Sequence, residues 1–333
     1  MNDKAVSLLE QYDIEVQRTR KGRGAILCDT TRGCLIFKEY IGNTDKVAVQ
    51  DKLLKQISRM GKVSVEAIFP AKDGSLLVKD HDNVSYILKT YFEGRECNIY
   101  DKGECVEAVR TLALLHSCME VPEEDCPGLL DYLPGREYEK HNRELRRVKR
   151  YLQKKGQKTW FEIALQDSIG YFLEQAEEIT GEWQSYADAG TGSEKSCPKV
   201  FCHGDYQYHN ILRTERGWGI INFEKCLLDN PIRDLYLLVR KLLEKSSWSI
   251  PLGKELLKAY DSILPISLYS RIDLYYRLAY PEKFWKIVNF YYNSGKAWIP
   301  EKNQEKLEKL LSQEKEKQHF LDVVFREIAK PFL

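Results

Sequence analysis

The chain has 333 residues, of which 43% are hydrophobic and 30% are Asp, Glu, Lys or Arg. Lys and Arg number 51 against 50 Asp and Glu, so the net charge is +1 and no overall positive field attracts nucleic acid or an anionic membrane. No apolar run approaches the roughly 18 residues of a membrane span, and the first residues are too polar for a secretory signal. We therefore expect a globular protein made in the cytoplasm, without a nucleic-acid or membrane partner.

The cysteines and histidines lack the spacing of metal sites. The nine cysteines include no Cys-x-x-Cys pair, and the six histidines include no His-x-x-x-His pair. An odd number of scattered cysteines also argues against a disulfide framework. We expect reduced, mostly buried thiols and no intrinsic zinc, haem or flavin.

Residues 14–92 have the features of short strands joined by tight turns, with one helix between them. β-branched and other apolar residues cluster in six runs separated by turn residues: 14–19, 24–30, 33–40, 63–69, 76–79 and 84–91. Between the third and fourth runs, apolar residues recur at helical spacing from Thr44, a typical N-cap residue, to Met60, and Gly61 follows. We predict a five- or six-stranded sheet with one inserted helix.

Beyond residue 92 the sequence changes to long segments of helical period that are rich in Leu, Glu and Lys. We therefore predict an α+β protein with a β-rich lobe over 1–92 and a helical lobe over 93–333. Segment 136–158 contains ten Lys or Arg against three Glu, which fits a solvated helix face or a dock for an acidic substrate or partner. Segment 186–198 is small and polar and predicts a loop, whereas 301–318 predicts a charged helix.

The most informative motif is His203-Gly204-Asp205, followed after four further residues by Asn210. A short apolar strand precedes it, and 219–223 predicts another strand after it. Phosphoryl transfer requires a group that orients a hydroxyl nucleophile and groups that neutralise the phosphates, usually through Mg²⁺. An Asp and an Asn at this spacing on a turning loop can perform these two tasks, as in the catalytic loop of kinases. His203 is either catalytic or a structural histidine that hydrogen-bonds backbone.

The chain resembles the CotS family of spore coat proteins, which are kinase-like proteins of endospore-forming bacteria related to aminoglycoside and choline kinases. The resemblance spans almost the whole chain and is carried by Tyr-Phe-Glu-Gly-Arg-Glu-Cys at 91–97, Lys-His-Asn-Arg-Glu-Leu-Arg-Arg-Val at 140–148, Cys-His-Gly-Asp-Tyr at 202–206 and Tyr-Pro-Glu-Lys-Phe-Trp-Lys-Ile at 280–287. It implies a two-lobed protein-kinase-like fold of the aminoglycoside phosphotransferase type. It also implies ATP and Mg²⁺ as cofactors and a place in the spore coat.

The resemblance assigns roles to individual residues. Asp205 resembles the catalytic base, and Asn210 resembles a magnesium ligand. Lys38 resembles the strand lysine that holds the α and β phosphates, and Asp234 the buried Asp that braces the catalytic loop. The resemblance also implies nucleotide contacts from the hinge, at Thr90, Tyr91 and Glu93. Further contacts are expected from Arg23 and Gly24 in a glycine loop, but this loop has only two glycines and fits a surface turn equally well.

The sequence departs from the family pattern at the expected metal site. The strand after the catalytic loop should carry an Asp that binds Mg²⁺, but Asn222 stands there. An amide oxygen can ligate Mg²⁺, yet the hard cation favours charged oxygen. Glu224 lies two residues after Asn222, so in an extended strand the two side chains share one face. Glu224 either replaces the missing Asp as a Mg²⁺ ligand or is only another acidic residue at the mouth of the cleft.

A second departure concerns the helix after Lys38. Kinases pair this lysine with a Glu on that helix, but 44–60 contains no Glu. Gln50 and Asp51 are the nearest candidates for its partner.

These features lead to three expectations for function. The first is a CotS-like protein with a nucleotide cleft whose phosphotransferase activity is impaired by Asn222, and which works by binding or assembly with coat proteins. The second is an active ATP- and Mg²⁺-dependent kinase for a hydroxyl of a small molecule, a sugar or a coat protein. The third is a purely structural coat component that does not bind nucleotide.

Overall fold

The computed structural model describes residues 7–22, 24–120, 134–189, 200–293 and 301–326. The chain forms two compact units, one made of Met1–Asp131, Lys199–Leu238 and Leu256–Pro265, the other of Tyr132–Pro198, Val239–Glu255 and Ile266–Leu333. The predicted lobe boundary near residue 92 lies inside the first unit and stays a prediction. Among the described helices, none is long and apolar enough to cross a membrane.

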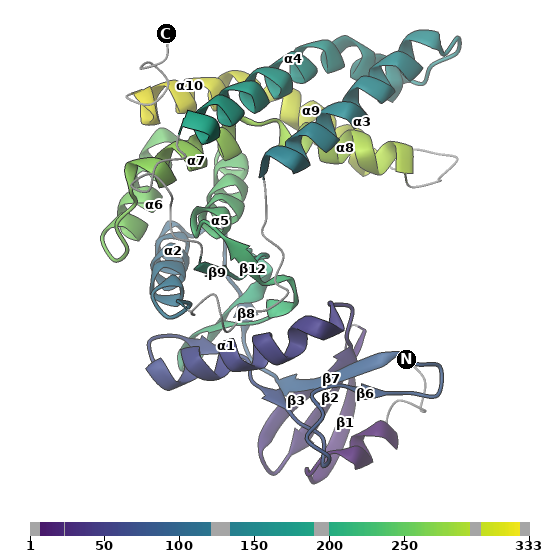
Figure 1. Ribbon diagram of the computed structural model, residues 1–333, viewed down its shortest axis with the longest axis vertical. Helices are drawn as coiled ribbons and strands as arrows, with labels where there is room; N and C mark the ends of the chain where they lie inside the picture. The colour runs from purple at the N-terminus through teal and green to yellow at the C-terminus, as the bar shows by residue number, and fades with distance from the viewer. Residues whose placement is uncertain (1–6, 23, 121–133, 190–199, 294–300, 327–333) are drawn as a thin grey trace. The chain divides into compact units, whose positions relative to one another are not determined.

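The first unit contains an antiparallel six-stranded sheet, which Figure 1 shows at the purple end of the chain. The strand order is β1-β2-β3-β7-β5, and β6 also pairs with β7. Alternating apolar residues place Cys28, Leu35, Phe37 and Leu88 in its core, each at most 1% exposed. Five of the six predicted runs are thus confirmed as strands, β1 (Val16–Gly22), β2 (Ala25–Thr30), β3 (Gly33–Glu39), β6 (Val78–Lys79) and β7 (Ser85–Thr90), and the sixth strand of the sheet is β5 (Ile68–Phe69).

The predicted helix is α1 (Val47–Met60), and a 3₁₀ turn, Thr44–Lys46, precedes it. The cap of this turn is Asn43 and not Thr44, because the Asn43 side chain accepts the Asp45 N–H at 2.9 Å. The helix ends at Gly61, whose φ of 66° places it in the left-handed region that glycine enters without strain.

The predicted strand 63–69 is wrong as a single element. It divides into β4 (Ser64–Val65), which runs parallel to β11 (Gly217–Ile220), and β5, which pairs with β7. The chain changes sheets here because Glu66 N still donates to the Ile220 carbonyl, whereas the Ala67 carbonyl already accepts the Thr90 N–H. The second sheet has the order β4-β11-β10-β8, with β10 (Ile211–Thr214) and β8 (Arg95–Glu96). A separate pair joins β9 (Val200–Cys202) to β12 (Leu227–Asp229).

Helices account for most of the remaining chain, as predicted. The first unit also holds α2 (Lys102–His116), and the chain passes between the units within α5 (Ile232–Lys245) and α6 (Ile250–Asp261). In the second unit α3 and α4 lie side by side (Figure 1) and make its most extensive helix contact. The helices of that unit are α3 (Pro134–Lys154), α4 (Trp160–Ala189), α7 (Leu268–Ala279), α8 (Glu282–Asn293), α9 (Glu301–Ser312) and α10 (Glu314–Val324).

Two boundaries in the second unit differ from the prediction. The predicted loop 186–198 begins inside α4, which continues to Ala189, and its part from 190 lies outside the described residues. The predicted helix 301–318 is two helices, because the chain turns at Gln313, whose buried side chain donates to the Glu244 carbonyl at 3.1 Å.

Candidate functional site

Asp234, at the start of α5, braces the loop that carries the His-Gly-Asp motif. Its carboxylate is fully buried and accepts the backbone N–H groups of His203 at 2.5 Å and Gly204 at 2.9 Å. His116 Nε2 lies 3.2 Å from the same carboxylate. Burial alone would raise the pKa of Asp234, but these partners outweigh it and lower the pKa, so the carboxylate is ionised. The brace predicted for Asp234 is confirmed.

His203 is a structural residue of this loop. Its Nδ1 accepts the Asp205 N–H at 3.2 Å, so Nε2 carries the proton and donates to the Ile221 carbonyl at 2.9 Å. The next residue, Gly204, has φ of 80°, and a Cβ there would lie 2.0 Å from the Lys225 carbonyl oxygen. Only glycine fits this close approach of the two backbone segments. The conformation of Gly204 in turn sets the direction in which the side chain of Asp205 leaves the loop.

Asp205, the predicted catalytic base, is held by two side-chain donors. Gln207 Nε2 donates to its Oδ1 at 2.5 Å, and Lys225 Nζ lies 2.9 Å from Oδ2. Burial raises the pKa of Asp205, but the Lys225 and Gln207 bonds lower it below its ordinary value. The side chain is 17% exposed, so the carboxylate is ionised and reachable. Lys225 was not predicted from the sequence, because its approach to Asp205 depends on the 3₁₀ turn Phe223–Lys225.

The predicted metal ligands and the predicted phosphate lysine form one chain of hydrogen bonds. Asn210 Nδ2 donates to the Asp205 carbonyl, Asn222 Nδ2 donates to Asn210 Oδ1, and Lys38 Nζ donates to Asn222 Oδ1, each at 2.8 Å. The amide orientations follow from this pattern of donors and acceptors. Asn222 therefore links Lys38 to Asn210, and the path reaches Asp205 at its backbone carbonyl; the convergence of the Asp205 carboxylate on this site stays a prediction.

The backbone at Asn222 corrects the expected position of Glu224. The predicted strand 219–223 ends at Ile220, and Asn222 adopts φ 67° and ψ 58°, a left-handed conformation that Asn tolerates better than most residues. A 3₁₀ turn, Phe223–Lys225, follows. The argument that Asn222 and Glu224 share one face of an extended strand is therefore wrong, and the turn is what directs Glu224 toward the six-stranded sheet.

Glu224 joins two lysines of that sheet. Its Oε1 lies 2.9 Å from Lys38 Nζ on β3 and 2.7 Å from Lys89 Nζ on β7. Lys89 in turn contacts Glu66 at 2.7 Å, and the Lys89 and Glu66 side chains are each 3% exposed. Burial alone would raise the pKa of Glu224, but the ammonium groups of Lys89 and Lys38 lower it well below the ordinary value. We call these four residues, Lys38, Lys89, Glu66 and Glu224, the buried charge network.

The helix after Lys38 does not supply its partner. Gln50 Nε2 donates to the Phe223 carbonyl at 2.5 Å, and Asp51 pairs with Lys55 on the same helix at 2.6 Å. The expectation that Gln50 or Asp51 faces Lys38 is therefore wrong. Sequence analysis also missed Lys89 and Glu66, although a lysine inside the apolar run 84–91 is itself a signal, because a buried lysine needs a carboxylate.

The expected hinge residues are tied to the sheet. Thr90 Oγ1 accepts the Ala67 N–H at 3.2 Å, and Tyr91 N donates to the Cys34 carbonyl at 3.0 Å. Glu93 is exposed and lies 3.7 Å from Arg20. In the glycine loop, Gly22 pairs with Ala25, and Gly24 has φ of 68°, so it occupies a tight turn between β1 and β2. Arg23 lies outside the described residues. The nucleotide contacts of these residues stay predictions.

The donors at the expected metal site do not fit Mg²⁺ as they are arranged. The side-chain oxygens of Asn210 and Asn222 are neutral, and each already accepts an N–H. Glu224 Oε1 faces two ammonium groups, which repel a cation. Mg²⁺ favours charged oxygens, and the carboxylate of this set, Glu224, is already neutralised by Lys38 and Lys89.

The buried charge network predicts a large effect of Lys89→Met on stability. Removing this ammonium leaves the buried Glu66 carboxylate without its cation and Glu224 with Lys38 alone, which should lower the free energy of unfolding by about 3–5 kcal/mol. The control is Lys55→Met, which breaks an ion pair whose lysine is 57% exposed and should cost below about 1 kcal/mol. Urea denaturation measures both, and equal losses would contradict a network held by buried charge.

The lowered pKa of Glu224 predicts a pH dependence. A carboxyl whose pKa is lower in the folded state stabilises the protein above its unfolded pKa, and this stabilisation disappears as the pH falls through the folded-state pKa. The ordinary value is 4.5. The stability gap between wild type and Glu224→Gln should therefore be constant above that pH and shrink below it. Urea denaturation between pH 7 and 3 tests this, with the exposed Glu215→Gln as control; a gap that stays constant to pH 3 would refute it.

Comparison with known proteins agrees with this fold. The family model described as "Spore coat putative kinase YutH" matches residues 5–324. Spore coat protein S of Bacillus subtilis (strain 168) is 32% identical over 124 residues, which are 37% of this chain and 35% of that protein. The matched part thus spans about a third of that relative.

Solved structures of phosphotransferases have the same fold. An aminoglycoside phosphotransferase from Alicyclobacillus acidocaldarius matches with a TM-score of 0.82 and 17% identity, covering 99% of this chain and 96% of that one. A spectinomycin phosphotransferase in complex with ADP and spectinomycin matches with a TM-score of 0.63 and 14% identity, covering 96% of each chain. The predicted α+β, aminoglycoside phosphotransferase-like fold is therefore confirmed. By its match over 5–324, the chain belongs to the spore coat putative kinase family YutH.

Proposed function

We propose that this chain is a spore-coat-associated protein that keeps a nucleotide cleft of the kinase-like fold but has impaired phosphotransferase activity. It is made in the cytoplasm and works by binding or assembly at the coat, with coat proteins as partners. One observation carries the proposal: Asn222 joins Lys38 to Asn210 by two hydrogen bonds where a kinase would hold Mg²⁺.

The chemistry of the amide supports this. Asn222 donates to one neighbour and accepts from the other, so it closes the site without a metal. A carboxylate at this position could accept from Lys38 but could not donate to Asn210. The Asn210 carboxamide oxygen and a carboxylate oxygen at position 222 would repel each other unless a cation lay between them. Asn222 therefore replaces the cation by a hydrogen bond.

The charges of the site support the same conclusion. Lys38 has the carboxylate partner that a kinase lysine requires, Glu224 at 2.9 Å, but a second of its hydrogen bonds goes to Asn222. Asp205 is held by Lys225, so a substrate hydroxyl must compete for its proton acceptor. We expect these two bonds to reduce reactivity toward phosphate and hydroxyl.

The proposal predicts that nucleotide binding responds little to Mg²⁺. In calorimetric titration of the purified protein, the affinity for ATP should change less than about threefold when Mg²⁺ is added, whereas Asn222→Asp should gain at least about tenfold with Mg²⁺ because a charged oxygen is restored. Asn83→Asp is the matched control, since Asn83 also has a positive φ, at 61°, but lies in an exposed turn. Strong Mg²⁺ dependence in the wild type would overturn the proposal, and no binding of ATP by any variant would favour the purely structural function.

The second candidate function is an active kinase, which the ionised and partly exposed Asp205 favours. The spectinomycin phosphotransferase and an aminopropanol kinase of the same fold act on hydroxyl-bearing compounds, so an acceptor of that class is the one to consider. The proposal and this candidate differ in what Asp205→Asn does to phosphate release.

We expect release of labelled phosphate from ATP by the wild type to equal that of Asp205→Asn, because the metal carboxylate is missing. Asn222→Asp should raise release above both, and the double variant Asp205→Asn/Asn222→Asp should lose the gain. Wild-type release at least tenfold above Asp205→Asn would establish the active kinase instead.

A further inference from the structure

Helix α3 in the second unit carries a line of cations along one face. Six basic residues follow one another at alternating spacings of four and three, and all six are exposed: Arg136, Lys140, Arg143, Arg147, Arg150 and Lys154. At about 100° per residue this spacing confines them to an arc of about 80° over a length of about 27 Å. We call this set the α3 stripe.

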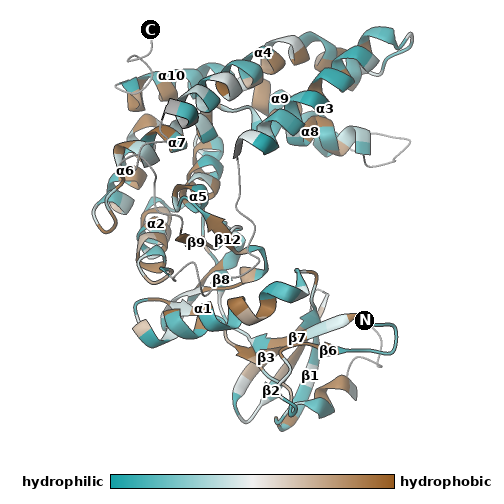
Figure 2. Cartoon of the chain, in the orientation of Figure 1, coloured by the Kyte–Doolittle hydropathy of each residue, from teal (hydrophilic) through white to brown (hydrophobic). Residues whose placement is uncertain are grey.

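The α3 stripe lies opposite the side of the helix that packs into the unit. Tyr138, Leu145, Val148 and Leu152 are buried and fall about half a turn away from the cations. Figure 2 shows α3 as mostly teal, in contrast to the brown patches of α7. The face that carries the cations is therefore a surface and not part of the core.

The cations of the α3 stripe have few carboxylate partners. Within the described residues, Arg143 alone of the six has a carboxylate within 4.0 Å, that of Glu139 at 3.9 Å. Two basic residues that lie off the stripe are paired closely, Arg146 of α3 with Glu177 at 2.5 Å and Lys155, just after the helix, with Glu162 at 2.7 Å. Like charges four residues apart destabilise a helix by a few tenths of a kcal/mol, about 0.2–0.5 per pair. The stripe therefore concentrates positive charge at some expense of helix stability.

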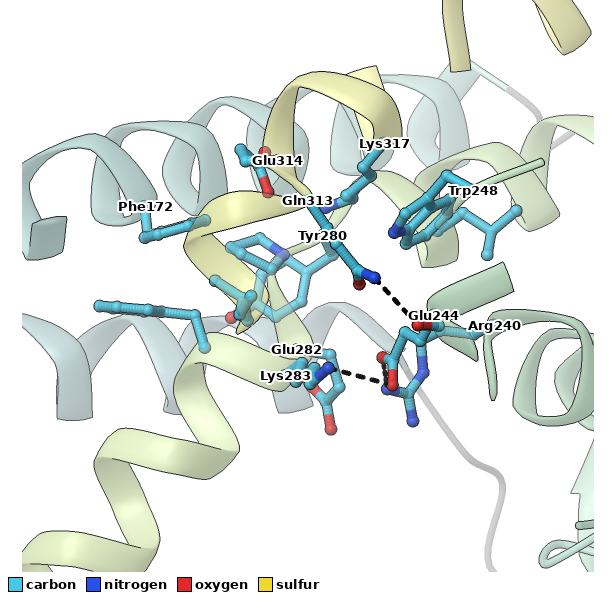
Figure 3. A pocket seen from close by; sticks show the side chains of 14 residues that line it. Phe172, Arg240, Glu244, Trp248, Tyr280, Glu282, Lys283, Gln313, Glu314 and Lys317 are labelled. Carbon is cyan, nitrogen blue, oxygen red and sulfur yellow. Dashed lines mark hydrogen bonds and ion pairs between the residues drawn. The ribbon is translucent and has the colours of Figure 1, made fainter. Parts of the chain in front are cut away.

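The cations of a nearby pocket behave differently. Figure 3 shows a pocket in the same unit, lined by Arg240, Lys283 and Lys317 among others. Arg240 and Lys283 both contact Glu244, at 2.6 and 3.3 Å, and Lys317 Nζ donates to the Ala279 carbonyl at 2.9 Å. These charges serve the packing of the unit, whereas those of the α3 stripe face outward.

An aromatic hollow adjoins the middle of the stripe. It lies between α3 and α8, has a volume of about 290 Å³, and is lined by Arg147 of the stripe together with Tyr151, Trp285 and Tyr292. Trp285 is fixed there because its Nε1 donates to Glu144 at 2.7 Å and its ring stacks on His141. A row of cations beside a rigid aromatic hollow is suited to a ligand that combines carboxylates with an apolar side chain.

We propose that the α3 stripe and its hollow bind an acidic segment of another polypeptide, independently of the nucleotide cleft. The cations repeat about every 5.4 Å along the helix, which matches carboxylates repeated on one face of an acidic helix. One apolar or aromatic side chain of the segment fills the hollow. A polypeptide fits better than a nucleic acid because Glu139 and Glu144 border the stripe, and only a ligand with charge on a single face avoids them.

The test is fluorescence anisotropy of labelled 20-residue poly-L-glutamate with the full chain at low and moderate salt. Arg143→Gln/Arg147→Gln/Arg150→Gln should raise the dissociation constant about tenfold, since several exposed ion pairs are lost together. The control is Lys302→Gln/Lys306→Gln/Lys309→Gln on α9, which removes the same charge from exposed positions interspersed with glutamates. This control should change the dissociation constant less than twofold. Circular dichroism checks that α3 stays helical in the triple arginine variant. This is expected, because the substitutions remove repulsion between like charges.

A second pair of measurements tests the hollow. A poly-L-glutamate peptide with one central Trp should bind the wild type about fivefold tighter than the plain peptide, and Tyr151→Ser, at a ring that is half exposed, should abolish this gain. Equal binding by the triple arginine variant and the wild type would overturn the proposal. Binding of a 20-nucleotide single-stranded DNA as tight as that of the Trp peptide would overturn it in favour of a nucleic-acid site.

Discussion

The contact on which the candidate site depends is that of Glu224 with two lysines of the six-stranded sheet. Lys89 is almost completely buried, so its ammonium requires a carboxylate, and Glu66 and Glu224 supply two. Because Glu224 also faces Lys38, the residue that would hold phosphates is positioned by the turn after β11 and not by helix α1. Gln50 of α1 supports that turn from behind by bonding the Phe223 carbonyl. Gln50 thus stabilises the backbone of the turn, and Glu224 in that turn neutralises Lys38.

From this contact a continuous path of hydrogen bonds leads back to the braced loop. Lys38 bonds Asn222, Asn222 bonds Asn210, and Asn210 bonds the backbone of Asp205, whose loop is held by Asp234. Each charged group on the path already faces an opposite charge or a dipole. Lys38, Asn222 and Asn210 thus satisfy one another internally, and the proposed loss of metal binding rests on these bonds.

Much of this could be predicted from local patterns. Alternation and helical spacing predict most strands of 14–91 and the helix after Lys38, the spacing of Asp205 and Asn210 predicts the loop, and the family resemblance predicts its brace at Asp234. The pairing of Lys89 with Glu224 could not be predicted in this way, because the two residues are 135 positions apart. Single backbone conformations are equally hidden: the left-handed Asn222 lies in a segment that its neighbours favour as a strand, and the change of sheet at Glu66 divides a run whose composition favours one strand.

The two sets of charges in this chain obey different constraints. A charge inside the first unit must be neutralised where it lies, since its desolvation is uncompensated otherwise, and the buried charge network meets this requirement with its own residues. A cation on the surface of α3 is hydrated and does not need a carboxylate partner. Six exposed cations can therefore lie along one face of the helix, and their mutual repulsion destabilises it only modestly. The buried charge network leaves its charges paired with one another, whereas five of the six cations of the α3 stripe have no carboxylate within 4.0 Å among the described residues.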